Sequence, residues 1–144
     1  MADDKNLNLL TDLIARARRA GADAADALYV QSAALEVRRR FGKAEKLERA
    51  ESSDLGLRVF VGKKQAIVSS TVMTEVALNE AVERALAMAR AAPEDPQAGI
   101  ADPSELAREF PDLDVCDPTE PTAEQLIARA DRSEERRVGK ECRL

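Results

Sequence analysis

Carboxylates between Pro93 and Pro121 are the first residues whose type suggests chemistry. They are Glu94, Asp95, Asp102, Asp112, Asp114 and Asp117. Carboxylate oxygens are good ligands for Ca²⁺, but an EF-hand places its ligands at fixed positions in a loop of about twelve residues. The carboxylates in this segment do not follow that spacing, and prolines interrupt them. The pattern therefore favours a solvated acidic linker over a calcium site.

The other reactive residue types point away from catalysis. The sequence contains no His, so it lacks the usual general base and the commonest zinc ligand. Cys116 has no base near it in the sequence, which favours a small packed side chain over a nucleophile. The stretch Gly62-Lys63-Lys64 lacks the spacing of a phosphate-binding loop and is better explained as a hairpin turn. We therefore assign no catalytic, cofactor-binding or metal-binding residue.

The charge balance argues against nucleic acid as a direct partner. The chain has 144 residues, with 22 Lys and Arg against 27 Asp and Glu, giving a net charge of -5. Binding to a phosphate backbone usually requires a basic surface. The run Arg38-Arg39-Arg40 is the one local exception. Alternation along a strand would send Arg39 to the face opposite its neighbours, so a solvated strand face is the favoured interpretation.

Cysteine content and the N-terminus predict a soluble cytoplasmic protein. The two cysteines do not make a disulfide framework, and a reducing compartment fits them best. The first residues are acidic and contain no continuous apolar run. They are therefore neither a signal peptide nor a membrane span.

Two helices are predicted from apolar residues at helical spacing. The first has Asn6 as its candidate N-cap, ends near Gly21, and carries Leu7, Leu10, Leu13, Ile14 and Ala17. The second begins after Thr74 and ends at Pro93. Its predicted apolar stripe comprises Val76, Leu78, Ala81, Val82, Ala85, Leu86, Met88 and Ala89.

Between these helices the apolar pattern has a period of two, which predicts strands over residues 27–33, 34–41, 44–50, 55–61 and 64–70. Two-residue loops at Gly42-Lys43 and Gly62-Lys63 place glycine first, as a type II′ turn requires. In the later hairpin Leu57, Val59 and Val61 should face away from Arg58 and Phe60. We expect an α+β fold in which a curved antiparallel sheet of two hairpins carries two main helices.

A proline- and aspartate-rich extended segment is expected after the second helix. It allows a short helical turn around Ser104 to Phe110, and Thr122 can cap a further helix that carries Leu126 and Ile127. The expected division is an α+β domain over residues 1–92, a linker with the start of a helix over 93–131, and a separate tail over 132–144.

Two stretches of this chain are distinctive: "GLRVFVGKKQAIVSSTVMTEVALNEAVERALAMARAAPEDPQAGIADP" and "FPDLDVCDPTEPTAEQLIARA". They resemble the N-terminal domain of the TldD/PmbA proteins, most closely the PmbA (TldE) branch. The shared pattern is a hairpin ending in Ser-Ser-Thr, an alanine-rich helix, a turn from Asp95 to Asp102, and a step from Asp112 to Pro118. The resemblance covers Leu7 to Asp131.

The resemblance implies a subunit of a bacterial cytosolic TldD–TldE metalloprotease complex. In that family the TldD-type subunit carries an H-E-x-x-x-H zinc motif, and PmbA-like proteins are also labelled modulators of DNA gyrase and associated with peptide maturation. No position in this chain matches the motif. We therefore expect zinc only in the TldD-type subunit. The expected partners are that subunit and a peptide or unfolded protein substrate, without a membrane.

The C-terminal stretch "RSEERRVGKEC", Arg132 to Cys142, equals one translated reading frame of a common short-read sequencing adapter. The apolar periodicity of the preceding helix also stops at Asp131. We therefore expect the natural reading frame to continue differently after Asp131. A natural charged tail is the alternative.

These observations leave three functional hypotheses. The preferred one is the N-terminal fragment of a PmbA-like subunit, inactive by itself because it lacks the metal site. A stand-alone interaction domain could instead bind a partner through a sheet edge or a helix. A truncated catalytic TldD-type protease would require a His motif downstream of residue 131.

Overall fold

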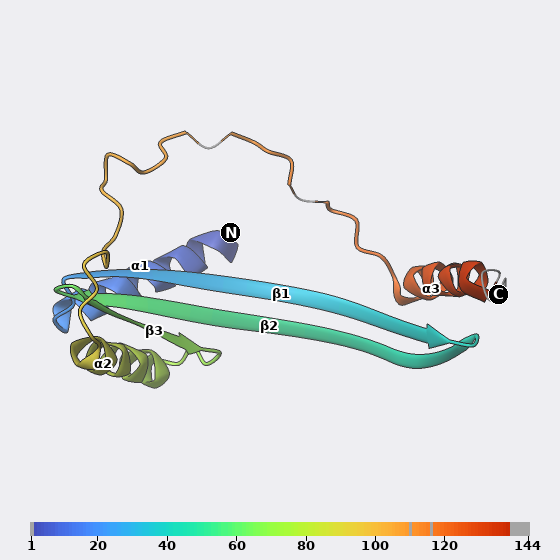
Figure 1. The fold of residues 1–144 in the computed structure, drawn as a ribbon, viewed down its shortest axis with the longest axis horizontal. Coiled ribbons are helices and arrows are strands. Elements are labelled where there is room, and N and C mark those ends of the chain that lie inside the picture. The colour runs from blue at the N-terminus through green and yellow to red at the C-terminus, as the bar shows by residue number, and fades with distance from the viewer. Residues whose placement is uncertain (1, 110, 116, 139–144) are drawn as a thin grey trace. The chain divides into compact units, whose positions relative to one another are not determined.

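The computed structural model describes residues 2–109, 111–115 and 117–138, and Figure 1 shows its elements. They are α1 (Ala2–Arg19), β1 (Ala24–Arg40), β2 (Lys43–Val61), β3 (Lys64–Ser70), α2 (Glu75–Ala91) and α3 (Ala123–Val138). The strands form one antiparallel sheet in the order β1-β2-β3. The predicted α+β class is thus confirmed.

The chain divides into two compact units. The helix–sheet unit contains the described residues of Met1–Gln31 together with Ser52–Arg108. The hairpin-tip unit contains Ser32–Glu51 and the described residues of Glu109–Leu144. The strands β1 and β2 are long enough to contribute to both units.

Helix α1 ends as the sequence predicts but begins earlier. Gly21 has a φ of +108°, and the N–H groups of Gly21 and Ala22 donate to the carbonyls of Arg18 and Ala17 at 3.1 and 3.0 Å. This is the Schellman arrangement, in which glycine takes the left-handed position. Asn6 is not the N-cap, because the helix begins at Ala2. Asp4 then lies in the first turn, where the helix dipole stabilises a carboxylate.

The strands are longer and fewer than predicted. Residues 24–40 and 43–61 are each one continuous strand, so β2 belongs to both hairpins. The turn at Gly62 has the positive φ, +59°, expected for glycine in the first position. The other turn lies one residue earlier than predicted. Phe41 and Gly42 form it with φ values of +51° and +69°, the pattern of a type I′ turn, whose twist matches that of the flanking strands.

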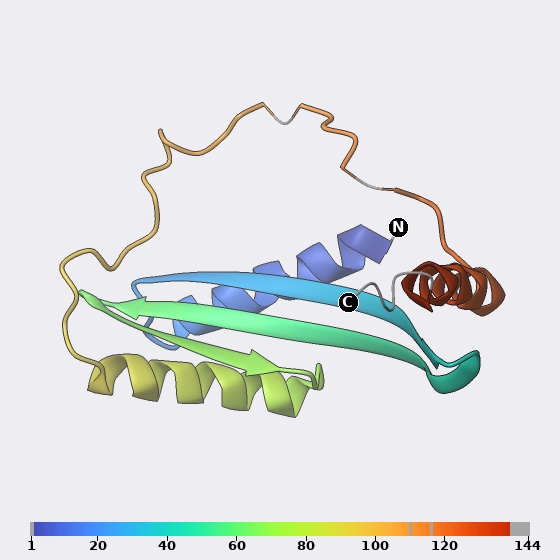
Figure 2. The same cartoon turned by 45° about the vertical axis from the view of Figure 1, so that its right-hand side comes forward.

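The core of the helix–sheet unit lies between one face of the sheet and both helices α1 and α2. Thr74 caps α2 by accepting a hydrogen bond from the Ala77 N–H at 3.4 Å, and Figure 2 shows α2 running alongside β3. The buried cluster includes Leu13, Ala17, Leu55, Leu57, Val59, Ala66, Val68, Leu78, Ala81, Val82, Ala85, Leu86 and Ala89. This apolar burial is the main stabilising term of the unit.

Four residues depart from the predicted pattern of burial, and the first is Leu7 of α1, which is 59% exposed. Val76 and Met88 are exposed by 67% and 47%, because each lies two residues from a buried leucine and so points to another side of the helix. Phe60 is 2% exposed, although its position in β2 places it on the face opposite Leu57 and Val59.

The segment after α2 runs extended to residue 122, with no helix among its described residues. In place of the predicted helical turn near Ser104, the Glu105 N–H donates to the Asp102 carbonyl at 2.9 Å. Helix α3 begins with a reciprocal capping pair. The Thr122 N–H donates to Gln125 Oε1 at 2.9 Å, and the Gln125 N–H donates to Thr122 Oγ1 at 3.3 Å. This capping box starts a helix that continues past Asp131 to Val138.

Candidate functional site at the tip of the first hairpin

The aspartates of the extended segment organise their own backbone. Asp95, Asp102, Asp112 and Asp117 each accept a hydrogen bond from the N–H two residues ahead, at 2.8–3.2 Å. Such Asx turns are a common use of aspartate in loops. Hydrogen bonds from Ser104 and Thr119 also lower the pKa values of Asp102 and Asp117. These four aspartates therefore accept hydrogen bonds from their own local backbone.

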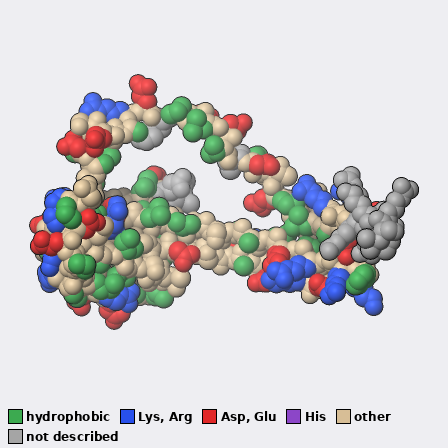
Figure 3. All heavy atoms as spheres, in the orientation of Figure 1, with side chains coloured by type: hydrophobic (Ala, Val, Ile, Leu, Met, Phe, Trp, Pro, Cys, Tyr) green, Lys and Arg blue, Asp and Glu red, His purple; other side chains and the backbone are tan. Residues whose placement is uncertain are grey.

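The structure does not gather the predicted acidic residues into a metal site. Among the described residues, no group of three or more His, Cys, Asp or Glu side chains is placed to hold a metal ion. Cys116 lies outside the described residues. The described carboxylates consequently stay distributed along the extended segment, as the spaced acidic side chains in Figure 3 show.

The stretch Gly62-Lys63-Lys64 forms the predicted hairpin turn. The Gly62 N–H donates to Asp23 Oδ2 at 2.6 Å. The ammonium groups of Lys63 and Lys64 donate to the carbonyls of Ala98 and Arg90, each at 3.3 Å. Both lysine side chains therefore bind backbone carbonyls at the end of α2 and in the segment that follows it.

The arginine run alternates as predicted. Arg38 contacts Glu36 at 2.5 Å on one face of β1, and Lys46 of β2 contacts the same carboxylate at 2.6 Å. Hydrogen bonds from Lys46 and Arg38 lower the pKa of Glu36. The Arg39 side chain has the opposite orientation and is only 16% exposed. The prediction that Arg39 lies on its own face is thus correct, but this face is not solvated.

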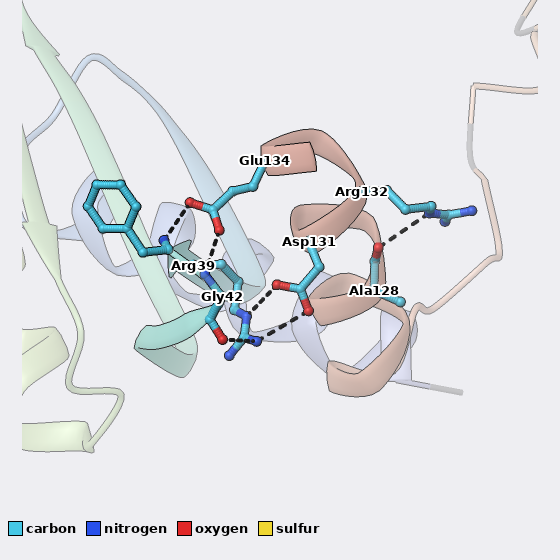
Figure 4. Close-up of polar contacts among 7 residues, drawn as sticks. Arg39, Gly42, Ala128, Asp131, Arg132 and Glu134 are labelled. Carbon is cyan, nitrogen blue, oxygen red and sulfur yellow. Dashed lines mark hydrogen bonds and ion pairs between the residues drawn. The ribbon is translucent and has the colours of Figure 1, made fainter. Parts of the chain in front are cut away.

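Arg39 forms a bidentate ion pair with Asp131 of α3, and Figure 4 shows the arrangement. Its Nε and one terminal nitrogen donate to the two carboxylate oxygens at 2.7 and 3.2 Å. The same terminal nitrogen donates to the Gly42 carbonyl at 2.8 Å. The hydrogen bond to Asp131 raises the pKa of Arg39. Two parallel bonds of this kind fix orientation as well as charge.

The turn itself binds a second carboxylate. The N–H groups of Phe41 and Gly42 donate to the two oxygens of Glu134 at 2.9 and 3.0 Å. Successive residues with positive φ turn their N–H groups toward a common point, which favours an anion there. The hairpin tip, meaning Arg39, Phe41 and Gly42, therefore receives two carboxylates spaced three residues apart on one helix face. It can bind and orient acidic groups, and it provides no nucleophile.

Two ion pairs fix the helix–sheet unit. Arg16 of α1 contacts Glu75 of α2 at 2.5 Å and donates to the side-chain oxygen Oδ1 of Asn79 at 3.0 Å. The hydrogen bonds of Arg16 to Glu75 and Asp12 raise its pKa. Separate hydrogen bonds join Arg58 Nε to both oxygens of Asp26 at 3.0 and 3.1 Å. These contacts tie helix to helix and strand to strand.

Residues 25–89 match the family model described as PmbA/TldA metallopeptidase domain 1. The chain is also 33% identical over 113 residues to "Metalloprotease PmbA" of Escherichia coli O157:H7. The chain contains the first domain of the PmbA/TldD family. The homologue of metalloprotease PmbA from Haemophilus influenzae is 32% identical over 99 residues.

This PmbA/TldD domain represents only part of those relatives. The match includes 78% and 69% of the chain, but it spans 25% and 22% of the two relatives. A crystal structure of a proposed modulator of DNA gyrase from Bacteroides thetaiotaomicron has the same fold. Its TM-score is 0.87 at 23% identity, over 99% of this chain and 33% of that one.

The PmbA/TldD pattern in this sequence now has a structural meaning. Its Asp95-Pro96, Asp102-Pro103 and Asp117-Pro118 steps are Asx turns in which the aspartate accepts from the residue after proline. The carboxylate contacts at the hairpin tip were not predicted from the sequence. The available signal was a pair of acidic residues three apart on a predicted helix, and nothing local links them to Arg39. Among the described residues, no helix combines the length and apolarity that crossing a membrane requires.

Proposed function

We propose that this chain is the N-terminal domain of a PmbA (TldE)-like subunit in a cytosolic TldD–TldE metalloprotease complex that processes peptides or unfolded proteins. The observation that carries this proposal is the 33% identity to Metalloprotease PmbA of Escherichia coli O157:H7 over 113 residues. The gyrase-modulator description of the Bacteroides thetaiotaomicron protein fits the same family.

In this proposal the domain is not catalytic and contributes by binding and positioning other groups. The sequence has no His, so a zinc site of the H-E-x-x-x-H type would belong to the TldD-type subunit. The hairpin tip offers an arginine and two backbone N–H groups, which suit positioning of carboxylates. The zinc, the TldD-like partner and the substrate are thus assigned to the assembled complex.

The first test is a cleavage assay on the purified 144-residue chain. We expect no zinc-dependent cleavage of an unstructured peptide, measured by mass spectrometry with and without added zinc. The matched control is the same preparation treated with a chelator. Chelator-sensitive cleavage by the chain alone would contradict the assignment of a non-catalytic domain.

The second test asks whether the domain works in a PmbA context. Residues 7–131 would replace the aligned segment of the Escherichia coli O157:H7 PmbA, and the chimera would be combined with its TldD partner. We expect it to co-purify with TldD and to support peptide cleavage. A chimera that folds by circular dichroism but does not bind TldD would refute the proposed subunit role.

A further inference from the structure

The outer face of the sheet in the helix–sheet unit exposes aliphatic side chains. Along β1, Ala25, Ala27 and Tyr29 belong to or pack against the core. Leu28 precedes Tyr29 and Val30 follows it, so both alternate to the other face, where Leu28 is 64% exposed and Val30 is 45% exposed.

The same face continues across β3. Ile67 is 63% exposed between the buried Ala66 and Val68. Its Cα partner on β2 is Arg58, which pairs with Asp26 on β1. The outer sheet face therefore consists of Leu28, Val30 and Ile67 around a cross-strand ion pair.

Gly56 leaves space on this face. It lies two residues before Arg58 on β2, so its missing side chain would point outward. A Cβ built on Gly56 meets no heavy atom within 4 Å. A side chain from outside the unit can therefore approach the β2 backbone at this position.

The outer face is not exposed along its whole length. Phe60, two residues after Arg58, is 2% exposed. The segment that follows α2 is bonded at the adjacent turn, where the Asp95 N–H donates to the Lys63 carbonyl at 2.8 Å. Ala98 of this segment is 5% exposed. The polypeptide beyond α2 thus runs toward this end of the sheet. The side chains of Leu28, Val30 and Ile67 are exposed to solvent.

We propose that the outer sheet face is the docking surface for the domain that follows the first domain in longer PmbA/TldD proteins. The matched relatives have about three-quarters of their length outside the aligned part, and the segment after α2 is hydrogen-bonded to the turn between β2 and β3, at the end of this sheet. The partner surface presents aliphatic side chains, one of which fills the space over Gly56. This inference concerns domain packing and does not depend on the proteolytic role.

Cysteine labelling tests this proposal directly. Ile67→Cys would be made in this chain in a Cys116→Ser, Cys142→Ser background, and at the aligned position of full-length Escherichia coli O157:H7 PmbA with its native cysteines replaced. A maleimide labelling rate would be measured in each protein relative to Glu83→Cys on the exposed side of α2. We expect the ratio of the two rates to fall at least tenfold in the full-length protein.

Two results would overturn the proposal. An equal ratio in both proteins would show that the face stays open. Protection that rises with the concentration of the 144-residue chain would assign the face to a second copy. As an independent readout, serine would replace Leu28 in this chain and the aligned residue in full-length Escherichia coli O157:H7 PmbA. The substitution should lower the thermal midpoint of the full-length protein and leave that of the 144-residue chain unchanged. Equal shifts in both proteins would contradict docking.

Discussion

Helix α2 offers a stringent test of the core, because two of its apolar residues differ in burial and little else. Leu86 is 3% exposed and Met88 is 47% exposed, although both belong to the stripe predicted from the sequence. Replacing a buried leucine with alanine costs about 2–5 kcal/mol, through lost transfer free energy and the cavity that remains. An exposed position away from specific contacts usually changes stability by about 0.5 kcal/mol or less.

We therefore expect Leu86→Ala to lower the free energy of unfolding by about 3 kcal/mol and Met88→Ala by less than about 1 kcal/mol. Alanine, leucine and methionine have similar helix propensities, so local helix stability does not explain the difference. Urea unfolding followed by circular dichroism would measure it. With a slope of about 1–3 kcal/mol per molar urea, the Leu86→Ala midpoint should fall by about 1–3 M. Equal midpoints for the two variants would refute the placement of α2 on the sheet.

Three further predictions concern the turns and the ion pairs. Gly42→Ala should lower the free energy of unfolding by about 1 kcal/mol because the φ of Gly42 is +69°. Gly56 has equal space for a Cβ and no positive φ, so Gly56→Ala should be neutral or stabilising. Urea midpoints would compare the two variants, and equal losses would contradict the turn assignment. The hydrogen bond from Arg16 lowers the pKa of Glu75 below its ordinary 4.5, so its contribution is present above pH 4.5 and lost as the pH falls through the folded value. Glu75→Gln should therefore reduce the acid dependence of the thermal midpoint, and an unchanged profile would refute this pairing. Asp131→Asn should speed amide hydrogen exchange in α3 without changing exchange in α2, and unchanged exchange in α3 would count against the Arg39 ion pair.

The helices and the second hairpin could be predicted from the sequence because local chemistry specifies them. Thr74 is a good N-cap, Gly21 suits the left-handed position, and Gly62 supplies the positive φ of its turn. Each signal lies within a few residues of the feature it specifies. The alternation around Arg39 was also correct, since the two-residue period of a strand is a local property.

The first turn and the burial of Phe60 could not be predicted in this way. A positive φ at Phe41 is disfavoured for a bulky residue, so local preference pointed to a turn that starts at Gly42. The observed turn lets both peptide N–H groups bind Glu134, a contact separated by more than ninety positions. Phe60 is buried on the predicted polar face of β2, and tertiary packing, not local pattern, determines that burial.

The two carboxylates at the hairpin tip, Asp131 and Glu134, differ in their relation to the stretch that resembles the TldD/PmbA proteins. Asp131 lies within that stretch, whereas Glu134 lies after it. The Arg39–Asp131 ion pair is therefore the contact that we propose is native to the domain. The N–H pair of Phe41 and Gly42 keeps its preference for an anion whatever residue occupies position 134, because the backbone conformation creates it.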